Sequence, residues 1–391
     1  MIRNRRAMSG AGAFLAASLL AGALAGFVPA GVSALSCVAW TGVQPPNVGA
    51  GDNALLGVST IAPCDAWAVG YSSNGTAKQT LIEHWTGTAW KHVASPNPGG
   101  SANTNVLNAV AATSRTNAWA VGSYDSASGA HALIEHWNGT TWKQVTSPAP
   151  AIFLGGVTAL SATSAWAVGY SSNGTAIQTL IEHWNGTAWT LVNSPNPAGA
   201  ARQNLLYSVT ATSSRNAWAV GDYFPGAQLQ TLILHWDGKA WRHVPSPNRG
   251  GSAQQNILHS VAAASRTSAW AAGTYGLTEQ TLIEHWNGTA WKLVKSPNPG
   301  GPLSENFLAG VTAISSSNAW AVGGYFDGTR FSTLALHWNG TAWKQVATPN
   351  PGGSARANLF NGVAATSRSN IWAVGAHFNG TVNHTLAVHC C

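Results

Sequence analysis

The stretch TLIEHWNGTAWKLV, from Thr281 to Val294, decides the fold because the chain contains near-copies of it throughout. TLIEHWNGTAWTLV stands at Thr179 to Val192, and TLIEHWTGTAWKHV stands at Thr80 to Val93. In each copy, two runs of apolar and aromatic residues flank an Asn-Gly or Thr-Gly pair. This pattern is typical of two strands joined by a tight turn. The chain therefore repeats one hairpin many times.

All twenty tryptophans of the 391-residue chain fall on repeat positions. One series lies in AWAVG-like motifs, spaced 47 to 52 residues apart, and two further series lie in HW pairs and in AW or TW pairs. Series by series, the positions are Trp67, Trp119, Trp166, Trp218, Trp270, Trp320 and Trp372; Trp85, Trp137, Trp184, Trp236, Trp286 and Trp338; and Trp40, Trp90, Trp142, Trp189, Trp241, Trp291 and Trp343. The seventh HW slot holds Cys390.

Each repeat predicts four short strands, which we call a to d. In the second copy they are expected at residues 106–112, 118–123, 132–137 and 141–146, with Asn138-Gly139 as the c–d turn. Four strands in a period of about fifty residues are typical of a propeller blade. We therefore predict an all-β, seven-bladed β-propeller made of four-stranded antiparallel blades.

The two ends of the sequence predict how the ring closes. Residues 39–47, AWTGVQPPN, align with strand d of the other copies, and residues 385–391, TLAVHCC, align with strand c. The last blade should therefore take strands a to c from the C-terminus and strand d from the N-terminus. This closure removes the exposed sheet edges that favour aggregation.

The four cysteines are all expected at this closure, and we consider them candidates for disulfides. Pairing of Cys37 and Cys64 with the two terminal cysteines is preferred, and a strained Cys390–Cys391 bond is the alternative. Metal binding by four thiols in an exported protein is the less favoured interpretation.

The composition and the first residues indicate an exported protein. Residues 1–34 combine three arginines, an apolar run and the small-x-small motif of Val32-Ser33-Ala34, so we predict a signal peptide there and a propeller over 35–391. Beyond residue 34, 16 basic and 12 acidic residues occur without any Lys/Arg run. We therefore expect no nucleic acid partner and no membrane span, and we expect a secreted or cell-surface monomer.

The stretch Trp320–Pro351, WAVGGYFDGTRFSTLALHWNGTAWKQVATPNP, resembles a kelch repeat. It has the Gly323-Gly324 pair after an apolar strand, an aromatic residue at Tyr325 and Trp343 opening its last strand. The resemblance covers residues 35–391 in seven copies, although only this copy has the double glycine. It implies a propeller and no particular activity.

The repeated EHW histidine predicts a structural role, because equivalent residues of a ring lie far apart. The glutamate before it, as in Glu83 or Glu284, is leucine or valine in three copies, so a catalytic role is not expected there. No metalloprotease, nucleophile-elbow or phosphate-loop motif occurs in the sequence. We predict no metal site and no cofactor.

The copies differ most in their b–c loops, which share one face of a propeller with the d–a loops. Each b–c loop begins with an aromatic residue, and charged residues follow in several blades. The candidate ligand-binding residues on this face are Tyr71, Tyr124, Tyr170, Tyr223, Tyr275, Tyr325, Phe378, Asp125, Asp222, Asp327 and Arg330. The competing interpretation is that each aromatic residue packs on its own blade.

Tyrosines beside carboxylates offer apolar faces to sugar rings and polar edges to hydroxyl groups. We therefore expect a non-catalytic binding or scaffold protein that recognises cell-surface or environmental glycans. The first alternative is a protein-interaction propeller at the cell surface. The second is a glycan-active hydrolase or lyase that depends on one unrepeated acid, with Asp222 or Asp327 the first to test.

Overall fold

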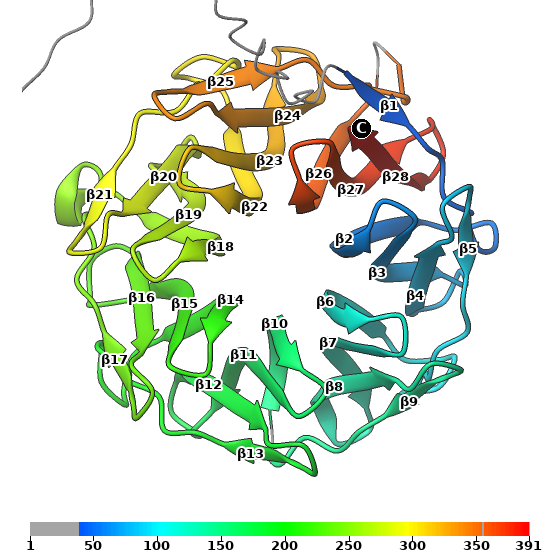
Figure 1. The fold of residues 1–391 in the computed structure, drawn as a ribbon, viewed down its shortest axis with the longest axis horizontal. Helices are drawn as coiled ribbons and strands as arrows, with labels where there is room; N and C mark the ends of the chain where they lie inside the picture. The colour runs from blue at the N-terminus through cyan, green and yellow to red at the C-terminus, as the bar shows by residue number, and fades with distance from the viewer. Residues whose placement is uncertain (1–38, 150, 354–355, 391) are drawn as a thin grey trace, which may run out of the picture. The chain divides into compact units, whose positions relative to one another are not determined.

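The computed structural model describes residues 39–149, 151–353 and 356–390, and the predicted signal peptide lies outside this part. Within it, seven four-stranded antiparallel sheets are arranged as the blades of a ring (Figure 1). The predicted fold class is confirmed.

The blades follow one another along the chain, each running from the innermost strand a to the outermost strand d. Their strands are β2 (Asn53–Ala62), β3 (Asp65–Ser73), β4 (Lys78–Trp85) and β5 (Trp90–His92); β6 (Asn105–Ser114), β7 (Asn117–Ser126), β8 (Gly129–Trp137) and β9 (Trp142–Gln144); β10 (Ala151–Ser161), β11 (Ser164–Ser172), β12 (Ile177–Trp184) and β13 (Trp189–Leu191); β14 (Asn204–Ser213), β15 (Asn216–Tyr223), β16 (Gln230–Trp236) and β17 (Trp241–His243); β18 (Asn256–Ser265), β19 (Ser268–Tyr275), β20 (Gln280–Trp286) and β21 (Trp291–Leu293); β22 (Asn306–Ser315), β23 (Asn318–Phe326), β24 (Phe331–Trp338) and β25 (Trp343–Val346); and β26 (Asn358–Ser367), β27 (Asn370–Phe378), β28 (Asn383–Cys390) and β1 (Trp40–Gly42). A single 3-10 turn, η1 (Gly251–Ala253), lies in the loop before β18.

The seventh blade closes the ring as predicted. Its sheet has the order β1-β28-β27-β26, and Trp40 of β1 lies opposite Cys390 of β28. Gln44, just beyond β1, also donates a 2.8 Å hydrogen bond from its side chain to the carbonyl of Thr385. The N-terminal strand therefore holds the C-terminal strands through backbone and side-chain hydrogen bonds.

Two strand features differ from the simple sequence pattern. Strand d is mostly only three residues long, as in β9, although Val145 N still donates a 2.8 Å hydrogen bond to the carbonyl of Ile134. Strand a carries a bulge, for example between Leu258 and Ser260. The glycine of the AWAVG motif lies against this bulge, and a Cβ atom on Gly273 would lie 2.0 Å from the carbonyl oxygen of Ile257. The repeated glycine is therefore a steric requirement.

The core consists of one tryptophan cluster at each boundary between blades. Trp270 of β19 is fully buried, and its ring lies 4.9 Å from Trp338 and 5.1 Å from Trp343 of the next blade. At the boundary of the sixth and seventh blades, Trp320 meets Trp40 at 5.3 Å and the buried Cys390 replaces the third ring. Such aromatic contacts each contribute about 0.5–1.5 kcal/mol beyond the buried area.

The EHW histidines complete this packing. His285 lies on Trp270 with ring centroids 4.1 Å apart, and its Nε2 is 3.1 Å from the hydroxyl of Ser268 at the start of strand b. In the second blade Asn117 takes the place of this serine and bonds His136 at 2.8 Å. Each histidine is thus stacked and hydrogen-bonded within its own blade, as the structural interpretation requires.

Candidate functional site

The central channel contains a cavity of about 210 Å³, lined by the seven innermost strands. Most of its lining is glycine, alanine, serine and valine, because the blades converge there and leave little room. A Cβ atom on Gly57, for example, would lie 2.9 Å from the Cα atom of Ala109. The larger polar residues of this lining are Asn108, Tyr207, His259 and Asn361.

Three of these four polar residues join neighbouring blades. Nδ2 of Asn108 donates to the carbonyl of Leu154, and Nδ2 of Asn361 donates to the carbonyl of Leu55, each at 2.9 Å. Nδ1 of His259 lies 3.0 Å from the carbonyl of Leu308. Because a carbonyl only accepts, Nδ1 carries the proton, and burial lowers the pKa of His259 and favours the neutral ring.

Tyr207 is the fourth polar residue, and it forms a pair with Asp222. Asp222 is fully buried, and burial raises its pKa to about 6 against the opposing effect of the Tyr207 hydroxyl. Among the described residues, neither carboxyl oxygen of Asp222 is within hydrogen-bonding geometry of a donor, so the carboxyl is buried without a hydrogen-bond partner and interacts with Tyr207 by proximity. Burial, and then the Asp222 charge, raise the pKa of Tyr207 far above its usual value, so the hydroxyl stays protonated.

An aromatic wall adjoins this pair on the third blade. Phe153 of β10 stacks on Tyr170 of β11 with ring centroids 4.8 Å apart. Tyr170 is close enough to Tyr207 to influence its pKa, and Tyr207 in turn meets His259 edge to face at 6.2 Å. A Cβ atom on Gly155 would lie 2.7 Å from the backbone carbonyl oxygen of Tyr207, so glycine is required beside this wall. We call Phe153, Tyr170, Tyr207, Asp222 and His259 the channel cluster.

The channel cluster lies towards the face that carries the b–c and d–a loops, which we call the b–c face. Asn204, the first residue of β14, pairs with Tyr223 at the end of β15. Tyr207 is the fourth residue of β14 and therefore lies near the end of the strand at the b–c face. Of the predicted residues, only Tyr170 and Asp222 belong to the cluster.

The remaining predicted aromatic residues do not form one ring. Tyr71 and Tyr170 directly follow the AWAVG glycine, whereas Tyr124, Tyr223, Tyr275 and Tyr325 stand one residue later and Phe378 two residues later. Neighbouring strand residues point to opposite faces of a sheet. The aromatic residues of different blades therefore face different surroundings.

Most of these aromatic side chains contact their own blade or the adjoining loop. Tyr124 stacks on His131 at 5.0 Å, and Lys78 lies 4.0 Å above the ring of Tyr71. The guanidinium of Arg249 lies 4.5 Å above Tyr275. Tyr223 and Tyr325 pack against the buried clusters of their blade boundaries, and Phe378 is half-buried.

The predicted charged residues of the loops have separate positions. Asp125 is exposed in the second blade. Asp327 accepts hydrogen bonds from the backbone N–H groups of Thr329 and Arg330, at 3.0 and 3.1 Å, and also pairs with the Arg330 side chain. The Thr329 hydroxyl also donates to Asp327, and this bond, followed by the backbone bonds, lowers the pKa of Asp327 to about 2. Asp327 thus builds a turn.

Tyr207 and His259 are not among the predicted site residues, because most residues of strand a are small. A signal was present nonetheless. The inner strands read NLLYSV and NILHSV in the fourth and fifth blades, where other copies have asparagine, alanine, glycine or leucine at the same place. A bulky or ionisable residue in the narrowest strand should point into the channel.

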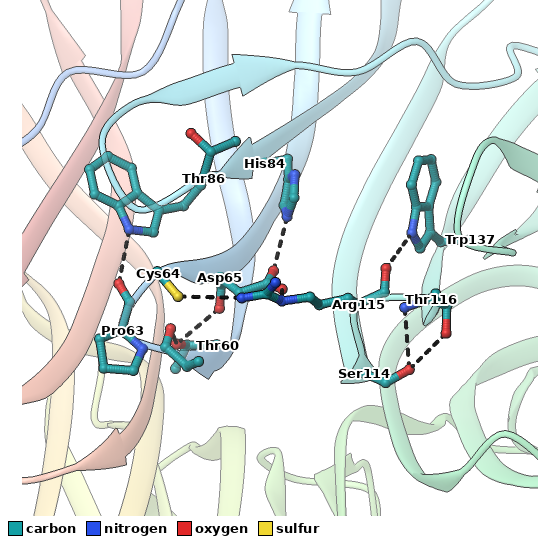
Figure 2. Close-up of polar contacts among 12 residues, drawn as sticks. Thr60, Pro63, Cys64, Asp65, His84, Thr86, Ser114, Arg115, Thr116 and Trp137 are labelled. Carbon is teal, nitrogen blue, oxygen red and sulfur yellow. Dashed lines mark hydrogen bonds and ion pairs between the residues drawn. The ribbon is translucent and has the colours of Figure 1, made fainter.

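Cys64 lies on the opposite face, which carries the a–b loops and the c–d turns and which we call the a–b face. It is exposed and free, so its expected disulfide with a terminal cysteine is not formed. Its Sγ instead accepts a 3.5 Å hydrogen bond from Arg115 (Figure 2). Cys390 is buried and not free, whereas Cys37 and Cys391 lie outside the described residues.

Within the described part of the chain, no group of three or more His, Cys, Asp or Glu residues is arranged to hold a metal ion. That part also has no helix with the length and apolar character needed to cross a membrane.

Comparisons with solved structures support the same fold. YCF48 from Cyanidioschyzon merolae is 16% identical and has a TM-score of 0.56, with 90% of this chain and 98% of that chain covered. The GH74 xyloglucanase from Xanthomonas campestris is 13% identical with a TM-score of 0.58, with coverage of 86% and 53%. A PL25 ulvan lyase bound to a GlcA–Rha3S saccharide is 10% identical with a TM-score of 0.56, with coverage of 86% and 93%.

At these identities the likeness extends to the fold alone. No protein-family model and no curated protein matches the sequence. The propeller is therefore established, and the kelch resemblance stays a prediction.

Proposed function

We propose that this protein is an exported, glycan-binding propeller whose binding site is the channel cluster on the b–c face. The observation that carries this proposal is the stacked Phe153–Tyr170 pair near Tyr207. Of these three residues, Tyr207 lines the central cavity. It is a single, unrepeated group of aromatic and polar side chains. Aromatic faces with a few fixed polar groups are typical of ligand pockets.

The chemistry of the cluster fits a sugar ring. The aromatic faces of Tyr170 and Phe153 suit apolar C–H groups, and the Tyr207 hydroxyl supplies a donor and acceptor. Asp222 is a positioning residue in this scheme, because it is buried and acts through the Tyr207 hydroxyl. The printed names of the similar structures, a xyloglucanase and an ulvan lyase, support a glycan as the ligand class. The signal peptide predicted over residues 1–34 supports export.

Binding to a panel of neutral and acidic polysaccharides tests this proposal. We expect saturable binding to at least one of them, weakened about tenfold or more in a Tyr170→Ala variant by loss of the aromatic face. Tyr325→Ala is the matched control, because Tyr325 packs on the boundary of the sixth blade. Absence of binding across the panel, or equal loss in both variants, contradicts the proposal.

A second candidate function is a glycan-cleaving enzyme, favoured by the Tyr207–Asp222 pair. The pKa of Asp222, raised to about 6 by burial, would suit proton transfer near neutral pH, while the protonated Tyr207 would donate a hydrogen bond to the substrate. Release of reducing or unsaturated sugar ends that is lost in Tyr207→Phe would support this function. A ligand that is bound and recovered intact would support the binding protein.

A further inference from the structure

The charged residues of the propeller are distributed unequally over its surface. The described chain contains sixteen lysine and arginine residues. Five of them lie at the b–c face, which also carries acidic residues such as Asp125, Glu305 and Asp327. These five are Lys78, Arg202, Arg249, Arg330 and Arg356. The other eleven, all exposed, lie on strand d, beside it or in the a–b loops: Lys91, Arg115, Lys143, Arg215, Lys239, Arg242, Arg266, Lys292, Lys295, Lys344 and Arg368. We call these eleven residues the cationic wall.

Strand d gives the wall a repeating pattern. Its middle residue is an exposed lysine or arginine in five of the seven blades and threonine in the other two. The a–b loops and the c–d turns lie together, since a Cβ atom on Gly238 would lie 2.8 Å from the side chain of Arg215. The loop arginines therefore extend the wall onto the a–b face.

Acidic residues neutralise little of this charge. Asp65 pairs with Arg115 at 3.2 Å, and Asp237 pairs with Arg242 at 2.9 Å. Among the residues that the structure describes, the other nine cations of the wall make no ion pair. The nearest remaining acids are the four fully buried glutamates of strand c: Glu83, Glu135, Glu182 and Glu284.

Burial favours the protonated, uncharged form of these glutamates. Burial raises the pKa of Glu182 to about 7 and that of Glu83 to about 8. It raises the pKa values of Glu135 and Glu284 well above the usual value. The wall therefore carries a net positive charge that the composition alone understates.

Apolar grooves lie between the cations at the blade boundaries. One groove of about 420 Å³ is lined by Lys295, Pro297 and Trp338, and an equivalent groove of about 330 Å³ is lined by Pro148 and Trp184. The indole N–H groups are already used, because Trp338 donates to the carbonyl of Ser316 and Trp184 to that of Ala162. The accessible parts of these half-buried rings are therefore apolar.

From this juxtaposition we propose that the cationic wall binds acidic polysaccharides, with sugar rings against the groove tryptophans and their carboxylate or sulfate groups paired with the wall lysines. A flexible polyanion can follow a convex wall that presents a cation in most blades and apolar grooves at two of the blade boundaries. A duplex nucleic acid would have to bend to follow such a surface, at a cost of about 1–6 kcal/mol, whereas a flexible polysaccharide would not. This surface is separate from the channel cluster and does not rest on the function proposed for it.

Binding of the full-length protein to polygalacturonate, with dextran as the neutral control, tests the proposal. We expect binding to polygalacturonate alone, and a fall of about tenfold or more on raising NaCl from about 0.05 to 0.5 M, because salt screens exposed charges. The triple variant Lys292→Glu, Lys295→Glu, Lys344→Glu should lose this binding, and the corresponding Lys→Arg variant should keep it. Trp184→Phe should bind more tightly than Trp184→Ala.

A charge-matched control lies on the other face. The triple variant Lys78→Glu, Arg249→Glu, Arg356→Glu changes the net charge equally and should retain binding. Equal loss in both triple variants, or equal binding to dextran, overturns the proposal. Tighter binding to single-stranded DNA than to polygalacturonate overturns it in favour of nucleic acid. Tyr170→Ala should leave this binding unchanged, so the wall and the channel cluster are tested separately.

Discussion

Nε2 of His84 lies 2.9 Å from Oδ1 of Asp65, and the other oxygen of that carboxylate holds Nε of Arg115 at 3.2 Å. Arg115 belongs to the second blade, so one buried carboxylate joins two blades (Figure 2). The other six copies have asparagine or serine at the position of Asp65. The pair is thus a charged version of a contact that the other blades make with neutral groups.

Replacing Asp65 by asparagine should have a small effect on stability. The amide keeps the bond to His84, as Asn117 does with His136, and only the pair with Arg115 is lost. Because the Arg115 side chain is 73% exposed, that loss should cost at most about 1 kcal/mol. Asp65→Leu should cost about 1–3 kcal/mol more, since His84 then lacks its partner. Urea unfolding measures both, and equal costs would show that the hydrogen bond to His84 is unimportant.

The four buried glutamates should make the protein less stable as pH rises. For Glu83, the pKa is about 8 in the folded protein and 4.5 in the reference state, because burial disfavours the charged form. Its contribution to stability is therefore complete below pH 4.5 and is lost as pH rises towards 8.

Glu83→Leu copies Leu234 and Leu336 of other blades and should raise the free energy of unfolding at pH 8 by more than about 1 kcal/mol. Unfolding followed by tryptophan fluorescence from pH 4 to pH 9 measures this, with Glu305→Leu as an exposed-loop control. A wild-type stability that does not change over this range contradicts the assignment.

The AWAVG glycine should not tolerate a side chain. In Gly273→Ala the new Cβ atom would lie 2.0 Å from the carbonyl oxygen of Ile257, so the bulge of β18 must move. We expect insoluble protein or a loss of more than about 3 kcal/mol, the range of strongly destabilising substitutions. Gly42→Ala is the control, because no atom lies within 4 Å of its Cβ position. Similar solubility and unfolding midpoints for the two variants would refute this.

The cysteines should differ in reactivity. Cys64 is exposed and free, so the native protein should be alkylated there within minutes, whereas the buried Cys390 should be protected. Peptide mass spectrometry without reduction tests this and also identifies the partner of Cys390, for which Cys37 and Cys391 stay the predicted candidates. A native disulfide that contains Cys64 would contradict the structure.

Glycan affinity should depend on pH through Asp222. Above its pKa of about 6, we expect the ionised carboxylate to attract the Tyr207 hydroxyl as a donor and to leave the phenol oxygen free to accept from a sugar hydroxyl. Affinity should therefore rise between pH 5 and pH 7, and it should be nearly constant in Asp222→Asn. Calorimetric titration at several pH values measures it, and an unchanged pH profile in the variant would remove Asp222 from the site.

Much of the fold could be predicted because each blade repeats the same buried tryptophan positions. Twenty tryptophans on three series of positions predicted the blade boundaries, and the AWTG and AVHC ends predicted how β1 pairs with β28. The site was harder to predict because its residues break the repeat. Tyr207 and Asp222 lie on adjacent strands at positions that vary in size and polarity from blade to blade, and the pairing of these strands brings the two residues near each other. The aromatic residues predicted after strand b stand one, two or three residues after the AWAVG glycine, and a shift of one residue reverses the facing of a strand side chain.

The most direct test of the central claim is a crystal structure of the protein soaked with the oligosaccharide that binds best in the panel. We predict a sugar ring in van der Waals contact with Tyr170 and hydrogen-bonded to the Tyr207 hydroxyl at the mouth of the channel. An empty channel mouth in crystals that hold the sugar elsewhere would contradict the assignment of the channel cluster as the binding site.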